Sequence, residues 1–275
     1  MANSYRKGEG KPDVLNRCSR REPPVSIAAL DPAITAATPL AWSPPPEMLA
    51  LAEGEIHVWR AWLDGLSGCS RRFAPTLAPD ELARAERFRF TRDKMRFVAG
   101  RGLLRLILSR YLGVPAERIV FDYGPRGKPR LGSASGRDLL HFNLAHSDGL
   151  AVYAMTRVGE VGIDLERVRR VSESKQIASY FFSERECAQW RSLPACLQTE
   201  AFFNCWTRKE ACLKANGEGI TESLKQVEVS LIPREPAQLL CLAGDPRAAA
   251  NWLLQALTPA LGYVGALAAR LEHSK

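Results

Sequence analysis

The sequence predicts an α+β protein built from two similar halves. Each half reads as strands, then helices, then strands, and the change between them falls near residues 155–160. The chain has 275 residues, of which 46% are hydrophobic and 25% charged, as expected of a globular protein with a full core. We expect an irregular extension over 1–45, a first half over 46–157 and a second half over 158–275.

The first 45 residues hold prolines and scattered charges with little periodicity, so we expect no regular structure and no chemistry there. They contain no continuous apolar core of the kind found in signal peptides. No apolar run in the chain approaches the roughly 20 residues that span a bilayer. These observations predict a cytoplasmic protein without a membrane segment.

The character of the sequence changes at Glu55, where Ile56, Val58 and Trp59 predict a first strand in the run H-V-W-R-A-W-L. Pro79 suits the first turn of a helix, and a longer helix is predicted over 92–112, closed by Gly113. The remaining elements are a strand over 118–123, a turn over 124–129, and a strand pair within 139–155 that is joined by a polar loop.

The second half opens with a strand in V-G-I-D-L-E, at residues 161–166. One helix starts in S-E-R-E-C-A-Q-W, where Ser183 and Glu186 form a capping box. A strong helix is predicted over 199–217 and stops at Gly217. Late strands are expected over 226–231 and 261–271. No sharp sequence repeat relates the two halves.

The seven cysteines form no C-x-x-C pair, and their number is odd. A zinc site or a disulfide framework is therefore not expected. Cys205 and Cys212 lie seven residues apart on one face of the predicted helix, where small buried side chains are the expected role.

The formal net charge is +8, and residues 71–105 carry ten Lys and Arg against four Asp and Glu. Such a positive field attracts phosphates, nucleic acid or acidic proteins. A solvated helix face would also account for this excess of positive charge. From charge alone, the solvated face is the favoured interpretation.

The pentapeptide G-I-D-L-E carries the first candidate site. Alternate side chains of a strand share a face, so Asp164 and Glu166 point together, away from Ile163 and Leu165. Adjacent carboxylates repel, and a divalent cation such as Mg²⁺ or Ca²⁺ removes that cost. An exposed strand face with neighbouring arginines accounts for the pattern as well, so both interpretations stay open.

The helical run W-T-R-K-E-A-C-L-K carries the second. Glu210 and Lys214 have the spacing of an ion pair on one face of a helix, and such a pair is enough to explain the presence of both residues. Alternatively, Glu210 completes a three-carboxylate site with the two strand carboxylates, and Lys209 and Lys214 are cations for a phosphate. His146, in a loop after a strand, and Lys128, at the tip of G-P-R-G-K-P, are taken singly more typical of surface residues.

Taken in order, these segments resemble one family, the 4'-phosphopantetheinyl transferases of the long, monomeric, surfactin-synthetase-activating type. The resemblance spans about residues 55–232 and depends on G-I-D-L-E and W-T-R-K-E-A-C-L-K, with support from F-F-S-E-R-E, G-K-P and F-N-L-A-H-S. It implies two α+β halves related by a pseudo-two-fold axis, with coenzyme A in the cleft between them. It also implies a monomer, because one chain supplies both halves.

The resemblance also implies roles for individual residues. The expected Mg²⁺ ligands, with Mn²⁺ also possible, are Asp164, Glu166 and Glu210. The expected coenzyme A contacts are Arg84, Arg96, Lys128, His146 and Lys214. The expected catalytic residues are Glu210, Glu186, Lys214 and Lys209, with Glu210 the first choice of general base and Glu186 the second. Ala145 departs from the family, which commonly has Ser or Thr there, and the missing hydroxyl contact is worth about 1 kcal/mol.

The implied reaction moves the 4'-phosphopantetheine arm of coenzyme A to a serine of an apo acyl, peptidyl or aryl carrier protein, as in secondary metabolism. The serine hydroxyl attacks the pantetheine-side phosphorus, and adenosine 3',5'-bisphosphate leaves. Such carriers are acidic helical bundles, which suit a protein of charge +8. The alternatives are a nucleic-acid-binding protein, an inactive carrier-binding relative, and a magnesium nuclease or phosphatase. No nucleic-acid motif is recognisable, so nucleic acid is not an expected partner.

Overall fold

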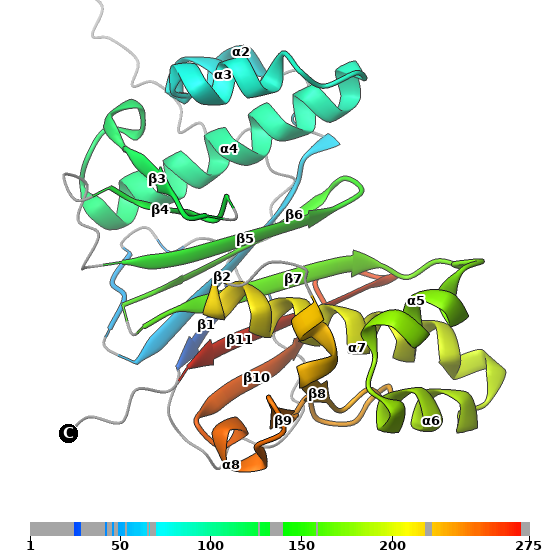
Figure 1. The fold of residues 1–275 in the computed structure, drawn as a ribbon. Helices are drawn as coiled ribbons and strands as arrows, with labels where there is room; N and C mark the ends of the chain where they lie inside the picture. The colour runs from blue at the N-terminus through cyan, green and yellow to red at the C-terminus, as the bar shows by residue number, and fades with distance from the viewer. Residues whose placement is uncertain are drawn as a thin grey trace, which may run out of the picture.

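The computed structural model describes residues 25–28, 42, 46, 49–52, 54–64, 66, 70–125, 127–132, 140–157, 159–217 and 222–270 (Figure 1). The strands and α-helices of the first part are β1 (Val25–Ala28), β2 (Glu55–Trp62), α2 (Ser70–Phe73), α3 (Pro79–Ala85), α4 (Thr91–Leu112), β3 (Phe121–Tyr123), β4 (Pro129–Leu131), β5 (His141–Ser147) and β6 (Leu150–Thr156). Two 3₁₀ turns, η2 (Ala74–Thr76) and η3 (Ala116–Arg118), lie between them.

The remaining elements follow in the second part of the chain. They are β7 (Val161–Arg167), α5 (Ser174–Phe181), α6 (Glu184–Ser192), α7 (Ala195–Asn216), the 3₁₀ turn η5 (Glu222–Gln226), β8 (Val227–Val229), β9 (Leu239–Leu242), α8 (Pro246–Ala249), β10 (Trp252–Leu257) and β11 (Tyr263–Arg270).

The two parts repeat one topology. In the first sheet the strand order is β1-β2-β6-β5, and in the second it is β10-β11-β7, so β2, β6 and β5 correspond to β7, β11 and β10. Both sheets are antiparallel, and each opening strand is followed by short helices, one helix of 22 residues and a small hairpin. This repeat is the arrangement that a pseudo-two-fold relation between the halves requires, and the α+β fold class is confirmed.

The layers run from α4 through the two sheets to α7 (Figure 1). On β6, Tyr153 and Met155 pack toward α4, whereas Val152 and Ala154 face the second sheet. This strand is buried on both faces, which explains its unbroken apolar sequence L-A-V-Y-A-M. Buried residues of both sheets thus form a shared core between the halves.

The halves meet along β5 and β7. The amide of Ile163 donates to Asn143 Oδ1 at 2.8 Å, and the amide of Arg167 donates to Ser147 Oγ at 3.1 Å. Both links join residues of the same sequence separation, so the two strands run in the same direction. The C-terminal end of β5 therefore lies beside that of β7, and side chains from both halves converge there.

The long helices end as the sequence predicts. Gly113 and Gly217 follow α4 and α7 in the left-handed conformation, with φ of 68° and 73°, which glycine adopts without a Cβ clash. The predicted strand at Glu55 and the helix over 92–112 are also confirmed.

Several expectations are wrong. The strand predicted over 118–123 is reduced to Phe121–Tyr123, because Ala116–Arg118 forms a 3₁₀ turn. The helix predicted from 199 already begins at Ala195. The elements not expected from the sequence are α2, α5, α8, β4, β9 and β10. The strand β1 pairs with β2 inside the segment expected to be irregular, most of which lies outside the described residues.

Five cysteines lie within the described residues, and none of these is in a disulfide. Cys205 and Cys212 are buried, as expected. Across the described residues, no helix is long and apolar enough to span a bilayer. The division into halves at residues 45 and 157 stays a prediction.

Candidate active site

The carboxylates of β7 lie between this strand and α7. Gly162, Asp164 and Glu166 share one face of β7, and Ile163 and Leu165 on the other face enter the core between the sheets. A Cβ at position 162 would collide with the backbone of Ala211 and Ala215. The glycine of G-I-D-L-E therefore lets α7 lie directly on β7 beside the two carboxylates.

The same close approach brings Glu210 and Lys214 of α7 to Asp164. Lys214 Nζ donates to Asp164 Oδ1 at 2.6 Å and to the carbonyl of Ile163 at 3.3 Å. Asp164 Oδ2 and Glu210 Oε1 are buried and accept no hydrogen bond from the described chain. The structure thus uses Lys214 across the helix–strand interface rather than in a helical pair with Glu210.

Burial and mutual repulsion raise the pKa values of Asp164 and Glu210. Burial raises the pKa of Asp164, Lys214 opposes the rise, and the negative charge of Glu166 adds to it. Burial, followed by the charge of Asp164, raises the pKa of Glu210 to about 7. Glu210 therefore exchanges its proton near neutral pH in the absence of another cation.

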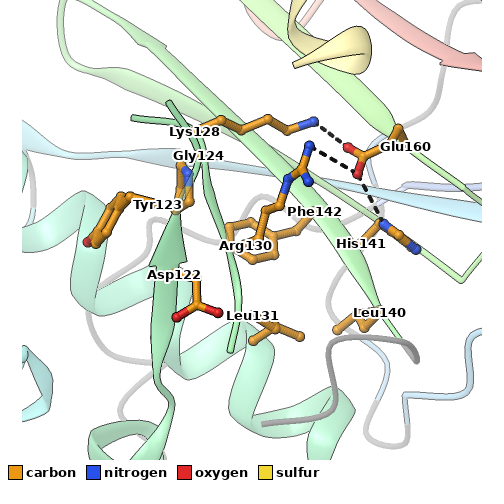
Figure 2. A pocket seen from close by; sticks show the side chains of 11 residues that line it. Asp122, Tyr123, Gly124, Lys128, Arg130, Leu131, Leu140, His141, Phe142 and Glu160 are labelled. Atoms are coloured by element: carbon orange, nitrogen blue, oxygen red, sulfur yellow. Dashed lines mark hydrogen bonds and ion pairs between the residues drawn. The ribbon is translucent and has the colours of Figure 1, made fainter. Parts of the chain in front are cut away.

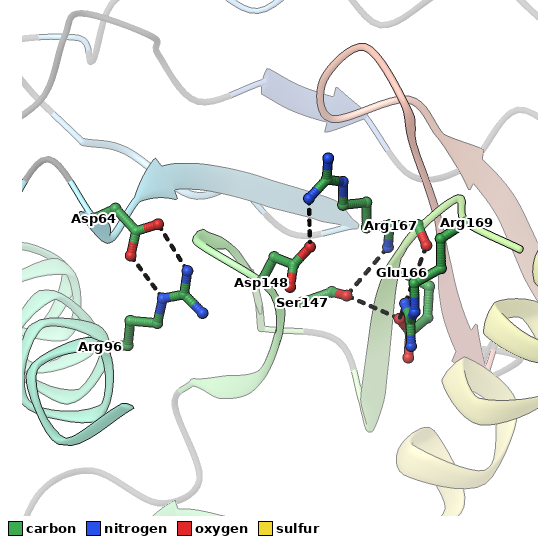
Figure 3. A network of polar contacts seen from close by, with 7 residues as sticks. All are labelled: Asp64, Arg96, Ser147, Asp148, Glu166, Arg167 and Arg169. Atoms are coloured by element: carbon green, nitrogen blue, oxygen red, sulfur yellow. Dashed lines mark hydrogen bonds and ion pairs between the residues drawn. The ribbon is translucent and has the colours of Figure 1, made fainter. Parts of the chain in front are cut away.

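Glu166, at the exposed end of the same face, is held from both halves (Figure 3). Ser147 Oγ donates to Glu166 Oε2 at 2.8 Å, and Arg169 Nη1 lies 3.3 Å from the same oxygen. Ser147 also accepts from the amide of Arg167. Sequence reasoning missed Ser147, although it directly follows His146 in F-N-L-A-H-S.

His146 lies next to this contact with a partly exposed ring at the end of β5. Protein atoms around the ring lower its pKa by removing water, and the positive charges of Lys214, Arg96 and Arg84 lower it further. Glu166 opposes them. Two arginines of the first half and the lysine of α7 thus make the surroundings of His146 positive.

Arg96 and Arg84 differ in how they are held. Arg96 makes a two-pronged pair with Asp64, with N–O distances of 2.6 and 2.7 Å (Figure 3). Arg84 is exposed, and its guanidinium lies 5.3 Å from the centre of the Phe97 ring. Arg84 also lines an open hollow of about 460 Å³ together with Arg87 and Phe88.

The amine of Lys128 is held by groups of the protein itself. Its amine donates to Glu160 Oε2 at 2.7 Å, to the carbonyl of Lys214 at 2.7 Å and to that of Val161 at 3.2 Å. It lines a pocket of about 320 Å³ between the β3–β4 hairpin and β5, which Figure 2 shows with Arg130, His141 and Glu160 around it. In this structure Lys128 links the hairpin to the start of β7 and the end of α7.

Glu186 and Lys209 form a buried pair away from the three carboxylates. Glu186 Oε2 lies 2.7 Å from Lys209 Nζ and also accepts from the amide of Ser183, so the capping box is confirmed. Glu186 Oε1 accepts from the amide of Val229. Both oxygens of Glu186 are therefore engaged by the protein itself.

The residues fit a divalent cation in part. Among the described residues, no group of three or more His, Cys, Asp and Glu side chains is arranged to hold a metal ion. Yet Asp164 Oδ2 and Glu210 Oε1 are two buried carboxylate oxygens without partners, and oxygen-only donors suit Mg²⁺. Glu166 adds negative charge to the same place but is bonded to Ser147 and Arg169.

Comparisons with known proteins agree with one another. Residues 160–268 match the family model described as the 4'-phosphopantetheinyl transferase superfamily, and residues 68–157 match the model described as 4'-phosphopantetheinyl transferase, N-terminal. The chain is 44% identical over 227 residues to the 4'-phosphopantetheinyl transferase HetI of a Nostoc species, covering 82% of this chain and 92% of that protein.

Two further relatives share lower identity over part of the chain. The 4'-phosphopantetheinyl transferase psf-1 of Bacillus pumilus is 36% identical over 157 residues, or 57% of this chain and 65% of that protein. The 4'-phosphopantetheinyl transferase Sfp of Bacillus subtilis is 28% identical over 162 residues, or 59% of this chain and 70% of that protein.

Proposed function

This chain belongs to the 4'-phosphopantetheinyl transferase family, and from that premise we propose how its residues carry out the transfer. It moves the phosphopantetheine arm of coenzyme A to a serine of an apo carrier protein. The serine oxygen forms a bond to the pantetheine-side phosphorus, and the bond from that phosphorus to the bridging oxygen breaks. Adenosine 3',5'-bisphosphate leaves with the electron pair of that bond.

One observation carries the assignment of the site. Lys214 of α7 donates to Asp164 at 2.6 Å, and its charge, with those of Arg96 and Arg84 of the first half, lowers the pKa of His146 at the end of β5. Cations for phosphates and carboxylates for a metal are thus adjacent at the junction of the halves. A diphosphate that spans the junction meets both.

Asp164, Glu166 and Glu210 are the residues that would hold Mg²⁺. Two unpartnered carboxylate oxygens and the accumulated negative charge support this assignment. The bound ion, or Mn²⁺ in its place, would neutralise charge on the diphosphate. Lys214 then contributes its own positive charge to the same phosphates.

Glu210 is our choice of general base. Its Oε1 is buried and has no hydrogen-bond partner among the described residues, so this oxygen is free to accept a proton. Glu186, the second choice, has both oxygens bonded to protein donors, and Lys209 donates only to protein acceptors. We therefore assign the serine proton to Glu210.

The nucleotide end is assigned to the cations of the first half. His146, Arg84 and Arg96 supply contacts for the 3'-phosphate, with Arg96 shared with Asp64. Lys128 is assigned to the nucleotide through the pocket that it lines. The charge of +8 supports an acidic carrier as the partner, and a monomer in the cytoplasm is the state in which we expect the protein to act.

The test is the mass of an apo acyl carrier protein after incubation with this protein, coenzyme A and Mg²⁺. We expect a gain of one phosphopantetheine group, lost with EDTA and with Glu210→Gln. Direct calorimetry should show that Glu210→Gln weakens Mg²⁺ binding. Retention on DNA without coenzyme A binding, or hydrolysis of a generic phosphoester, would instead support the alternatives of a nucleic-acid-binding protein or a nuclease.

A further inference from the structure

Lys209 is next to Glu210 in the sequence, yet its ammonium group is bonded only to acceptors inside the protein. Its side chain is 0% exposed, and its amine donates to Glu186 Oε2 at 2.7 Å, to the carbonyl of Leu224 at 2.8 Å and to that of Val227 at 2.5 Å. An ammonium group has three protons to donate, so these three acceptors use them all. No donor of Lys209 is left for a phosphate or a carrier.

The first half contains the same arrangement with an arginine. Arg105 and Glu81 are each 1% exposed, and Arg105 Nε lies 2.7 Å from Glu81 Oε2. Arg105 Nη1 donates to the carbonyls of Ala116 and Ile119, at 3.0 and 2.8 Å. The arginine therefore joins a glutamate and two carbonyls, as Lys209 does.

The two arrangements correspond position by position. Arg105 and Lys209 each lie seven positions before the end of a helix of 22 residues. Glu81 and Glu186 each occupy the third position of a short preceding helix and accept from the amide of its N-cap residue. In each half the two carbonyls are three residues apart, at the 3₁₀ turn before the small hairpin.

This correspondence indicates that the buried pair has a structural role rather than a chemical one. The first pair lies in the half that carries none of the three carboxylates, and on the α4-facing side of β2 it is His57 and Trp59 that contact the long helix, both at Tyr111. A device present in both halves belongs to the scaffold that they share. In the second half, however, the helix that it anchors also carries Glu210 and Lys214.

We propose that Glu186 and Lys209 are positioning residues whose buried ion pair anchors α7 to α6 and to the turn before β8, so that Glu210 and Lys214 meet Asp164. Lys209 fixes the rotation of α7 one residue from Glu210, and the bare backbone at Gly162 fixes its separation from β7. This inference rests on the proposed function, whose reacting groups it leaves unchanged, and it removes Glu186 and Lys209 from them.

A double-mutant cycle separates positioning from direct chemistry. The variants are Glu186→Gln, Lys209→Met and the double variant, with Lys209→Arg to reproduce the cation of the first half. For each, the melting temperature, kcat and KM for coenzyme A are measured with an apo acyl carrier protein that the unaltered enzyme modifies. The matched controls are Glu81→Gln, Arg105→Met and their double variant.

We expect either single variant in the second half to lower kcat by about ten- to a hundredfold, since small misplacements of reacting groups cost rates of that order. The double variant should melt higher and turn over faster than the worse single variant, because it leaves no unpaired buried charge. Lys209→Arg should keep kcat within a few-fold. The first-half variants should lose melting temperature similarly and raise KM for coenzyme A, because α3 and α4 carry Arg84 and Arg96, while kcat, measured below their unfolding, stays within about twofold.

Two results would overturn the inference. One is a loss of kcat above about a thousandfold in Glu186→Gln at an unchanged melting temperature, not relieved by Lys209→Met, which is the behaviour of a base. The other is second-half variants that melt lower yet keep full kcat. Failure of the proposed function is a separate result, because the unaltered protein itself would then leave every carrier unmodified while the melting cycles could still be read.

Discussion

At the scale of single residues, the candidate site is unusual for its unsatisfied groups. Asp164 Oδ2 and Glu210 Oε1 are buried without a hydrogen-bond partner among the described residues, and burying such groups costs stability. Lys214 compensates one oxygen of Asp164, and the high pKa of Glu210 lessens the remaining repulsion. The arrangement is poor for stability and suited to a ligand that supplies positive charge.

Ser147 gives a direct test of the contact between the halves. Ser147→Ala removes the donor to Glu166 and the acceptor for the amide of Arg167, so we expect kcat/KM to fall about tenfold, close to the value of one charge-assisted hydrogen bond. Ser147→Thr keeps the hydroxyl and should retain activity. Ser109→Ala removes a hydroxyl contact at the end of α4 and serves as the control that loses stability alone.

Unchanged kinetics in Ser147→Ala would show that Glu166 needs no support from β5. The comparison requires steady-state rates at saturating and at limiting coenzyme A, measured on all three variants.

Glu160 gives a test in acid. Partial burial acts to raise its pKa, but the His141 ring 3.8 Å away, the hydrogen bond from Lys128, and the charges of Lys128 and Arg130 outweigh this and lower it to about 2. The folded state thus binds its proton less tightly than the unfolded state, so Glu160 stabilises the fold above about pH 4.5, and this contribution disappears as the pH falls toward 2. Because its side chain is 35% exposed, solvent screening reduces the contribution to about 1 kcal/mol.

Urea unfolding from pH 2 to pH 7 measures this. Glu160→Gln should be about 1 kcal/mol less stable than the unaltered protein at pH 7 and equal to it near pH 2. Glu117→Gln, at an exposed glutamate of η3, is the matched control. A difference that stayed constant over this range would contradict the charge explanation.

Residue-level prediction from the sequence succeeded where one element decides the geometry. Strand alternation alone places Asp164 and Glu166 on one face, and the spacing from Ser183 to Glu186 alone gives the capping box. The partners of Lys209 and Lys128 could not be predicted in this way. They are carbonyls and carboxylates from distant segments, which only the folded chain brings near.

At the scale of elements, the contact between β7 and α7 decides the site. Gly162→Ala adds a methyl group against the backbone of α7, which cannot turn away as a side chain can. We expect a loss of about 3 kcal/mol in the free energy of unfolding and a large loss of kcat as α7 shifts. Chemical denaturation and transfer rates at a temperature below unfolding measure both.

Gly100→Ala is the matched control on α4. Its added methyl would lie 3.8 Å from Tyr153 Oη and 3.9 Å from Leu63 Cδ1, which are ordinary contacts. Alanine is the better helix former by up to about 1 kcal/mol, so this variant should be as stable as the unaltered protein or more so. Equal behaviour of the two variants would contradict the close-packing argument.

Elements were predictable when they were long or carried a clear end signal. The two helices of 22 residues end at Gly113 and Gly217, and both glycines were read correctly. The elements that escaped prediction are mostly short, such as β9 with its four residues L-L-C-L. Such a run shows no alternation of apolar and polar residues, and its pairing with β8 depends on contacts that form only in the folded chain.

At the scale of the whole molecule, charge leads to a prediction about the partner. With a formal net charge of +8, the protein should attract an acidic carrier mainly by raising the association rate. We expect KM for an acidic carrier to rise about tenfold between 50 and 500 mM sodium chloride, with kcat nearly constant. The measurement is a carrier titration at saturating coenzyme A, and a KM independent of salt would exclude electrostatic recruitment.

The duplication of the fold was only partly predictable. The sequence shows two halves of like pattern without a repeat, because equivalent positions hold different side chains, such as Arg105 and Lys209. The two halves share their topology and hydrogen-bond pattern but not their residues. A likeness of this kind is visible only in the three-dimensional structure.

The unequal occupation of two matching faces has a consequence for any molecule that lies across the junction. On a perfectly symmetric scaffold such a molecule could bind in two directions of equal energy. Here the α7-facing side of β7 carries Asp164 and Glu166, and the α4-facing side of β2 carries Trp59. The two orientations of the bound molecule therefore differ in binding free energy, and the nearly symmetric fold binds it in one direction.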